Sequence, residues 1–143
     1  MPTLSQVKVG QTTYDICDAE AREKILKLYE TSVTGNSLTV HFKRLGSLVN
    51  IYQLGSVTPS TANNWITIGT VTSGFRPKDT LGFSGIARQG TSIANSRTFL
   101  YSLNSAGEIN FVAASTAAQT PLINSCFFTE ENLPNLTPKI LSY

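Results

Sequence analysis

The chain has 143 residues, a hydrophobic fraction of 41% and a formal net charge of +2. This length allows one domain plus a short appendage, and the small net charge, with no Lys and Arg clusters between aromatic residues, argues against nucleic-acid binding. Charged residues make up 14% of the chain, against roughly 25% in soluble domains. Ser, Thr and Asn supply 43 residues, and such a surface is typical of β-rich extracellular or virion proteins.

The sequence carries no pattern for membrane insertion, a disulfide framework or a metal site. No run approaches the roughly 18 apolar residues of a membrane-spanning helix, and the first residues lack the basic and apolar regions of a signal peptide. Cys17 precedes an expected helix and Cys126 lies in an expected strand, so we do not expect them to pair. His41 is the only histidine, which leaves no metal-ligand spacing. We therefore expect a protein that folds in a cytoplasm without a cofactor.

The first 37 residues predict a hairpin, a helix and a linker. Two alternating runs flank a Gly-Gln dipeptide, which indicates a small β-hairpin over residues 6–16. Asp18 suits a helix N-cap and is followed by glutamates in the first turn, so we expect a helix over residues 19–30. Residues 31–37 include a Gly-Asn pair and are expected to link this helix to the main domain.

The predicted helix carries an apolar stripe whose members are spaced four and three residues apart: Ala21, Ile25 and Leu28. Two interpretations are open. The helix packs on its own domain through this stripe, or it forms a short parallel bundle with other copies of the chain. A dozen residues are too few for a free coiled coil, and composition alone does not decide between the two.

The rest of the chain predicts strands separated by Gly, Asn and Ser turns. Eight segments fit a strand pattern, and the last is the shortest: residues 38–44, 47–54, 65–71, 81–88, 97–103, 108–113, 122–129 and 139–141. No second helical period lies between them. This pattern predicts that residues 38–143 form an antiparallel β-sandwich, with a jelly-roll-like arrangement.

Alternation along the strands predicts their faces. Leu38, Val40 and Phe42 alternate with polar residues, whereas residues 97–103 carry bulky side chains on both faces. We expect one face of that segment to pack in the core and the other to meet a neighbouring subunit. Only nine charged residues follow residue 44, and because interface cores are depleted of charge, part of this surface is expected to be buried against other copies.

Residues 65–77 combine a strand with a defined exit. The strand is rich in β-branched residues, and a Ser-Gly pair ends it before a proline that restricts the residue ahead of it. We expect this stretch to be a scaffold motif, with the tryptophan packed in the core, and its members are Trp65, Gly69, Gly74, Phe75, Arg76 and Pro77.

Catalytic arrangements are missing from the sequence. A Ser or Cys triad needs a histidine and a nucleophile motif, and only His41 is present, on the polar face of a predicted strand. Glycan cleavage needs two carboxylates on opposite sides of a sugar bond. Glu130 and Glu131 are adjacent and fit a solvated turn. We therefore do not expect an enzyme.

Sugar binding without cleavage is a remaining possibility for the aromatic residues. Exposed aromatic faces beside short polar groups suit sugar rings. Tyr52 and Tyr101 are the candidate glycan-binding residues, whereas Trp65 and Phe75 are expected to serve packing.

Two stretches resemble bacteriophage proteins. Residues 65–77, read Trp-Ile-Thr-Ile-Gly-Thr-Val-Thr-Ser-Gly-Phe-Arg-Pro, with Leu-Asn-Ser-Ala-Gly-Glu-Ile-Asn at 103–110, resemble the C-terminal knob of phage fibres and receptor-binding proteins. Residues 7–16, read Val-Lys-Val-Gly-Gln-Thr-Thr-Tyr-Asp-Ile, with Asp-Ala-Glu-Ala-Arg at 18–22, are similar to the opening segment of phage head fibres and tail-tip proteins.

The resemblance implies an anchor, a stalk and a knob in that order. Residues 1–17 would dock on a capsid, tail or baseplate protein, residues 18–37 would form a short helical stalk and linker, and residues 38–143 the knob. It also implies a homotrimer, in which Ala21, Ile25 and Leu28 of three copies would meet because the knob holds them at high effective concentration.

The function implied is that of a short fibre in the virion, assembled in the host cytoplasm, whose knob binds host-surface or environmental glycans without cleaving them. One short helix as the stalk favours a head fibre over a long tail fibre. The alternatives are a capsid decoration without a ligand, a tail-tip receptor-binding protein and, disfavoured by the carboxylate count, a polysaccharide depolymerase.

Overall fold

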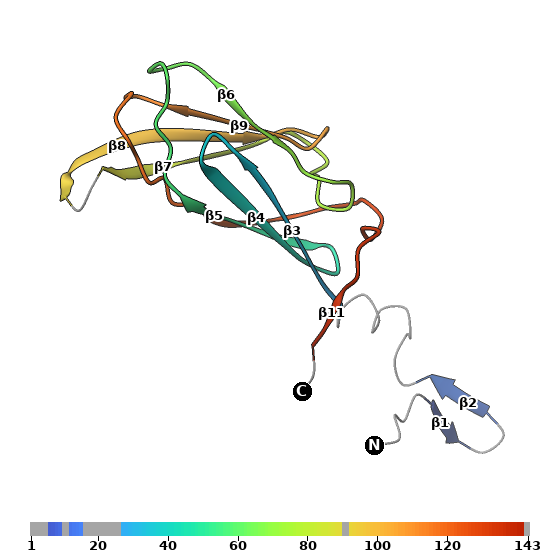
Figure 1. Cartoon of the computed structure of the whole chain (residues 1–143). Helices are drawn as coiled ribbons and strands as arrows, with labels where there is room; N and C mark the ends of the chain where they lie inside the picture. Colours follow the sequence, from blue (N-terminus) through green and yellow to red (C-terminus); the bar gives the residue numbers. More distant parts are fainter. Residues whose placement is uncertain (1–5, 10–11, 16–26, 90–91, 142–143) are drawn as a thin grey trace.

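The computed structural model describes residues 6–9, 12–15, 27–89 and 92–141 (Figure 1). All regular structure within these ranges is β. The strands are β1 (Gln6–Val9), β2 (Thr12–Asp15), β3 (Lys27–Gly35), β4 (Leu38–Leu45), β5 (Leu48–Gly55), β6 (Ile66–Thr70), β7 (Leu81–Gln89), β8 (Ser92–Leu103), β9 (Glu108–Ala113), β10 (Asn124–Phe128) and β11 (Lys139–Ile140).

The predicted N-terminal hairpin is confirmed. Strands β1 and β2 pair antiparallel, with Gln6 opposite Asp15 and Val9 opposite Thr12, and they form a two-stranded sheet of their own. Most of the predicted helix, with Ala21 and Ile25 of its apolar stripe, lies outside the described residues.

Strand β3 corrects the prediction for residues 27–37. It pairs antiparallel with β4, and the two-residue turn between them is Asn36 and Ser37, both with positive φ, as a tight hairpin requires. The predicted helix is therefore wrong from Lys27 to Glu30, and the predicted linker is strand and turn. Tyr29 is buried here. Side chains of this segment alternate between the two sides, as they do in a strand. The segment forms an additional strand of the sheet.

Two antiparallel sheets pack face to face (Figure 1). One has five strands in the order β10-β5-β4-β3-β11, and the other has four in the order β6-β9-β8-β7. All eight segments predicted between residues 38 and 141 contain a strand. The prediction of a mainly β fold with antiparallel sheets is thus confirmed for the described residues, and the two sheets are compatible with the predicted sandwich.

The connectivity differs from a jelly roll. Strands β7, β8 and β9 follow one another, and β6 lies beside β9, so the four-stranded sheet is a single Greek key. Strands β3, β4 and β5 form a meander. A jelly roll combines two Greek keys, whereas here consecutive strands mostly pair within one sheet.

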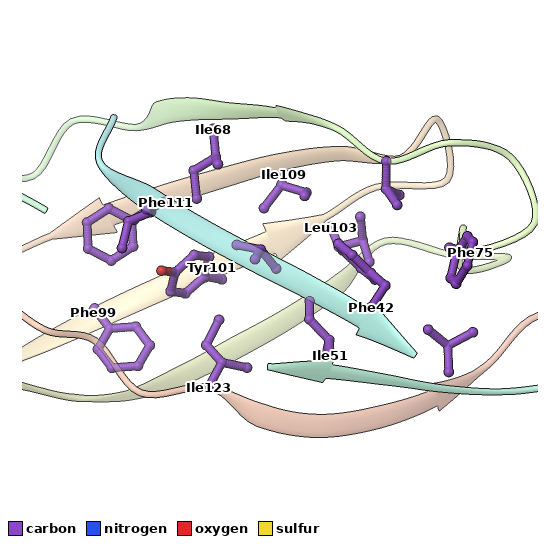
Figure 2. Close-up of a cluster of buried hydrophobic side chains, with 14 of the residues drawn as sticks. Phe42, Ile51, Ile68, Phe75, Phe99, Tyr101, Leu103, Ile109, Phe111 and Ile123 are labelled. Atoms are coloured by element: carbon purple, nitrogen blue, oxygen red, sulfur yellow. The ribbon is translucent and has the colours of Figure 1, made fainter. Parts of the chain in front are cut away.

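The core fills the space between the sheets (Figure 2). The five-stranded sheet contributes Leu38, Val40, Phe42, Val49 and Ile51, and the four-stranded sheet contributes Ile68, Phe99, Tyr101, Leu103, Ile109 and Phe111. The predicted inward face of the segment at 38–44 is therefore correct, and in the segment at 97–103 the inward face is that of Phe99, Tyr101 and Leu103. Alternation places the remaining residues of each strand on one of two outer faces.

The two sheets approach most closely where β3 meets β6. A Cβ atom on Gly35 would lie 2.0 Å from the carbonyl oxygen of Ile68, and one on Gly69 would lie 2.6 Å from Cγ1 of Val33. Gly69 follows a register shift in the pairing of β6 with β9. Backbone contact of this kind leaves no room for side chains, so both glycines are needed for the sheets to meet here.

Candidate functional site

The outer face of the four-stranded sheet carries a row of apolar side chains. Because Ile66 pairs with the inward-facing Phe111, the preceding Trp65 lies on the outer side. Val112 pairs with Leu100 in the next strand, on the same outer side. Trp65 is 54% exposed and Leu100 is 43% exposed. Large apolar residues side by side on an open sheet mark an interaction surface.

Two shallow hollows flank this row. The first, of about 320 Å³, is lined by Asn63, Trp65, Thr98, Phe99, Leu100, Val112, Ala113 and Ala114. The second, of about 350 Å³, is lined by Trp65, Thr80, Leu81, Gly82, Phe83, Ser84, Leu100, Tyr101 and Ser102. Trp65 and Leu100 thus line both hollows and separate them.

A polar row runs beside the apolar one. Thr67 Oγ1 donates to Asn110 Oδ1 at 2.7 Å, and Asn110 Nδ2 donates to Glu108 Oε1 at 2.6 Å. Ser102 pairs with Asn110 in the neighbouring strand. Hydroxyl and amide groups therefore lie next to an exposed indole, the combination that recognises sugars. This face is the candidate functional site, and we call it the Trp65 face.

The prediction that Trp65 packs in the core is wrong. The error has a clear physical origin, because Ile66 and Ile68 both point inward and a strand alternates its sides. A residue next to Ile66 must then point outward. The alternation was visible in the sequence, but the prediction gave more weight to the size of the indole.

Tyr101, a predicted glycan contact, has a buried side chain. It is 1% exposed and packs against Phe99 and Phe111 (Figure 2), with ring centroids 5.5 Å and 4.8 Å away. Its hydroxyl has no hydrogen-bond partner, and burial raises the pKa of Tyr101 above its ordinary value. Tyr101 shares the inner face with Phe99 and Leu103, so alternation predicts its burial.

Tyr52, the other predicted glycan contact, lies on the outer face of the five-stranded sheet. Its ring stacks on His41 with a centroid distance of 4.8 Å and an interplanar angle of 11°. Lys43 Nζ lies 5.4 Å from the ring centroid, a cation–π distance. The neighbouring Asn50 donates to Asn124 Oδ1 at 3.1 Å. Tyr52 therefore makes contacts within its own sheet.

An ion-pair group completes this second outer face. Glu30 pairs with Lys43 at 3.2 Å and also with Lys139. The hydrogen bond from Lys139, followed by that from Lys43, holds the pKa of Glu30 below its ordinary value against the effect of burial. The same contact with Glu30 is the main cause of the raised pKa of Lys43. We call this surface, with Tyr52 and His41, the Tyr52 face.

A buried arginine joins three segments at one end of the sandwich. The Arg44 guanidinium donates to the carbonyl oxygens of Gly46 at 2.7 Å, Glu131 at 2.8 Å and Asn132 at 2.9 Å, and also to that of Gly74. Burial lowers the pKa of Arg44, although a guanidinium stays charged in proteins. Two of these acceptors, in Glu131 and Asn132, lie 87 and 88 residues away from Arg44 along the chain. No local sequence pattern could therefore reveal this role.

The scaffold motif takes part in the same network. The Glu131 carboxylate accepts hydrogen bonds from the backbone N–H groups of Gly74 and Arg76. Gly74 has a φ of 91° and faces Pro134, and Phe75 packs edge-on to Phe42. Residues 74–77 therefore connect the sheets to the C-terminal segment. Glu131 was expected in a solvated turn and instead holds this turn in place.

The lining of the two hollows on the Trp65 face is uncharged. None of the residues that line its hollows is acidic, basic or histidine. Among the described residues, no group of three or more His, Cys, Asp or Glu side chains could hold a metal ion. In the same ranges no helix has the length and apolar character to cross a membrane. The chain matches no protein-family model and no curated protein sequence.

Proposed function

We propose that this chain is a short fibre subunit of a bacteriophage virion whose sandwich binds glycans, without cleaving them, through the Trp65 face. The observation that carries the binding proposal is an exposed tryptophan between two hollows, with hydroxyl and amide groups around it. An indole covers the apolar side of a sugar ring while short polar groups meet its hydroxyls.

The virion assignment rests on sequence motifs. The segment at 7–16 resembles a phage attachment peptide, and those at 65–77 and 103–110 resemble a phage knob. In this proposal residues 1–17 dock on a capsid, tail or baseplate protein. The virion is assembled in the host cytoplasm, and three copies associate through the segment that contains Ala21 and Ile25.

The chemistry of the face supports the proposal of binding without cleavage. Glycoside hydrolysis needs two carboxylates on either side of the scissile bond, and neither hollow is lined by any. Glu108 lies on the neighbouring polar row, where it accepts a hydrogen bond from Asn110. A single carboxylate in this position orients a ligand or its neighbour and does not supply an acid and base pair.

A glycan array tests the binding proposal. We expect the full chain to bind and Trp65→Ala to weaken binding at least about tenfold. Tyr52→Ala is the matched control, because it removes an aromatic ring from the opposite outer face, and we expect it to change affinity less than about twofold. Unchanged binding by Trp65→Ala would contradict the proposal, and loss only in Tyr52→Ala would move the site to the other sheet.

A ligand-free structural role is the second candidate. Leu100 and Ile86 are 43% and 66% exposed on the outer side of the four-stranded sheet, and such residues also suit a contact between subunits. Light scattering should give three times the chain mass of 15.5 kDa. If Trp65→Ala instead yields a monomer and no glycan binds the parent chain, the Trp65 face is a subunit contact.

A further inference from the structure

We propose that the ligand of the Trp65 face is an internal stretch of a neutral polysaccharide chain. This inference rests on the proposed function and adds the class and the binding mode of the ligand. Three observations lead to it, namely the position of the hollows, the absence of charge in their lining, and the carboxylate beside them.

The two hollows lie on opposite sides of the same pair of residues. Trp65 and Leu100 line both of them, so a sugar ring on the indole has space for a linked ring on either side. Both hollows lie on the outer face of the sheet, the first at Thr98 and Val112 and the second at Gly82 and Ser84. Two hollows that share the indole suit a polymer that continues in both directions.

The polar groups in the lining are all neutral. The first hollow offers Asn63 and Thr98, and the second offers Thr80, Ser84 and Ser102. Acidic sugars carry carboxylate or sulfate groups, which proteins recognise with Arg or Lys. Removing such a group from water without a charged partner is unfavourable. Hydroxyls and amides instead match the alcohol and amide groups of neutral sugars.

Charged residues of both signs also occur in the neighbouring segments. Glu108 is on the adjacent polar row, and its negative charge would repel an acidic chain. Lys78 is paired with Glu130 at 3.1 Å. Arg97 pairs with the buried Ala87 of β7. Alternation therefore directs it to the other side of the sheet from Thr98. The Trp65 face therefore favours neutral over acidic ligands.

Gly82 provides a way to test both parts of the inference. It lines the second hollow, and a Cβ atom placed on it would meet no atom within 4 Å. A side chain can therefore enter the hollow without disturbing the fold. Gly82→Gln, Gly82→Glu and Gly82→Lys add similar length with no charge, a negative charge and a positive charge.

The experiment measures binding of the full chain and these variants to neutral polysaccharides (dextran, mannan, galactan, laminarin) and acidic ones (polygalacturonate, alginate, hyaluronate). We expect binding to at least one neutral polymer, with less than about a twofold change in affinity between about 50 and about 500 mM NaCl. All three Gly82 variants should weaken binding by similar factors, because each fills the hollow.

Competition with oligosaccharides of the bound polymer tests the binding mode. Affinity should rise from the monosaccharide to at least the trisaccharide, since rings on both sides of Trp65 add contacts. A monosaccharide that competes as well as the hexasaccharide would overturn the internal mode.

The outcomes separate the inference from the proposed function. Binding to an acidic polymer that Gly82→Lys strengthens and Gly82→Glu weakens would overturn the neutral class, while loss of that binding in Trp65→Ala would still support the site. Binding that is unaffected by Trp65→Ala, or no binding to any polymer, would overturn both.

Discussion

The two outer faces of the sandwich differ in whether their side chains already have partners. On the Tyr52 face, Tyr52 stacks on His41, and Glu30 pairs with two lysines. On the Trp65 face, the indole is more than half exposed beside two hollows. Aromatic residues occur on both, so an aromatic side chain alone does not mark a site. The useful distinction is whether a neighbour in the same sheet already covers the ring.

Replacement of Arg44 should cause the largest loss of stability, because its hydrogen bonds support both faces together. Arg44→Met leaves four carbonyl groups without their donor and Glu131 without a nearby cation. Loss of one partner in a buried charged network typically costs about 3–5 kcal/mol. Urea unfolding followed by circular dichroism would measure the loss of unfolding free energy.

Arg76→Met is the matched control for Arg44→Met. The Arg76 side chain makes one hydrogen bond in this region, from Nε to the Val71 carbonyl at 3.3 Å, so we expect a loss of about 1 kcal/mol. Equal losses of unfolding free energy in the two variants would show that the hydrogen bonds of Arg44 contribute no more to stability than the single bond of Arg76.

Gly35→Ala should disturb the Trp65 face indirectly, because it displaces β6. The new Cβ atom would collide with the Ile68 carbonyl in β6, so β6 and the adjoining Trp65 must move. Overpacking of this kind typically costs about 1–3 kcal/mol. Thermal unfolding and glycan binding should both weaken. Gly82→Ala is the control for thermal unfolding, since its Cβ atom meets nothing within 4 Å, and an unchanged Gly35→Ala protein would contradict the close approach of the sheets.

Tyr101→Phe should leave both outer faces unchanged and stabilise the core. The buried hydroxyl has no partner, and an unsatisfied buried polar group costs about 1–3 kcal/mol. A gain of about 1 kcal/mol in unfolding free energy is therefore expected. Loss of stability in this variant would show that the hydroxyl is hydrogen-bonded in solution.

The same residue predicts a pH dependence. Burial raises the folded-state pKa of Tyr101, while the unfolded side chain ionises near about pH 10. The unfolded state then binds fewer protons than the folded state at high pH, so stability falls as the pH rises above about 10. Tyr101→Phe should reduce this alkaline loss, which denaturant titrations at several pH values would detect.

Glu30→Gln should have the smallest effect and test the pairing on the Tyr52 face. Exposed ion pairs contribute about 0.2–1 kcal/mol. Because Lys139 and Lys43 lower the pKa of Glu30, its contribution is present above the unfolded pKa and is lost as the pH falls through the folded pKa. Unfolding curves between neutral pH and about pH 3 would measure this.

Glu130→Gln is the control for Glu30→Gln. Glu130 pairs only with Lys78 among the residues described, and both side chains are more exposed than Glu30. We expect no measurable change in stability at neutral pH. Equal losses of stability in the two variants at this pH would indicate that the ion pairs of Glu30 contribute no more than an exposed pair.

Most of the sandwich was predictable from local sequence, and its first strand was not. Alternation and turn residues located the strands from β4 onward. Strand β3 was missed because capping residues and an apolar spacing of four and three favoured a helix through Leu28. Its pairing with β4 outweighs that local preference, as tertiary context does for weak propensities.

The site was harder to predict than the fold. Trp65 and Tyr101 were assigned to the wrong sides because residue type was given more weight than the alternation of their own strands. Arg44 was missed for a different reason, since its acceptors in residues 131 and 132 are brought to it only by the complete fold. The alternation of side chains along a strand can correct the assignments of Trp65 and Tyr101. No pattern along the chain indicates the contacts of Arg44.

The position of the Arg44 acceptors also affects the order of events during synthesis. Glu131 and Asn132 lie near the C-terminal end of the sandwich, and β11 follows them before pairing with β3. Residues 131 and 132 must therefore leave the ribosome before the buried guanidinium can bind these two acceptors. We expect nascent chains to remain sensitive to protease until both residues have emerged.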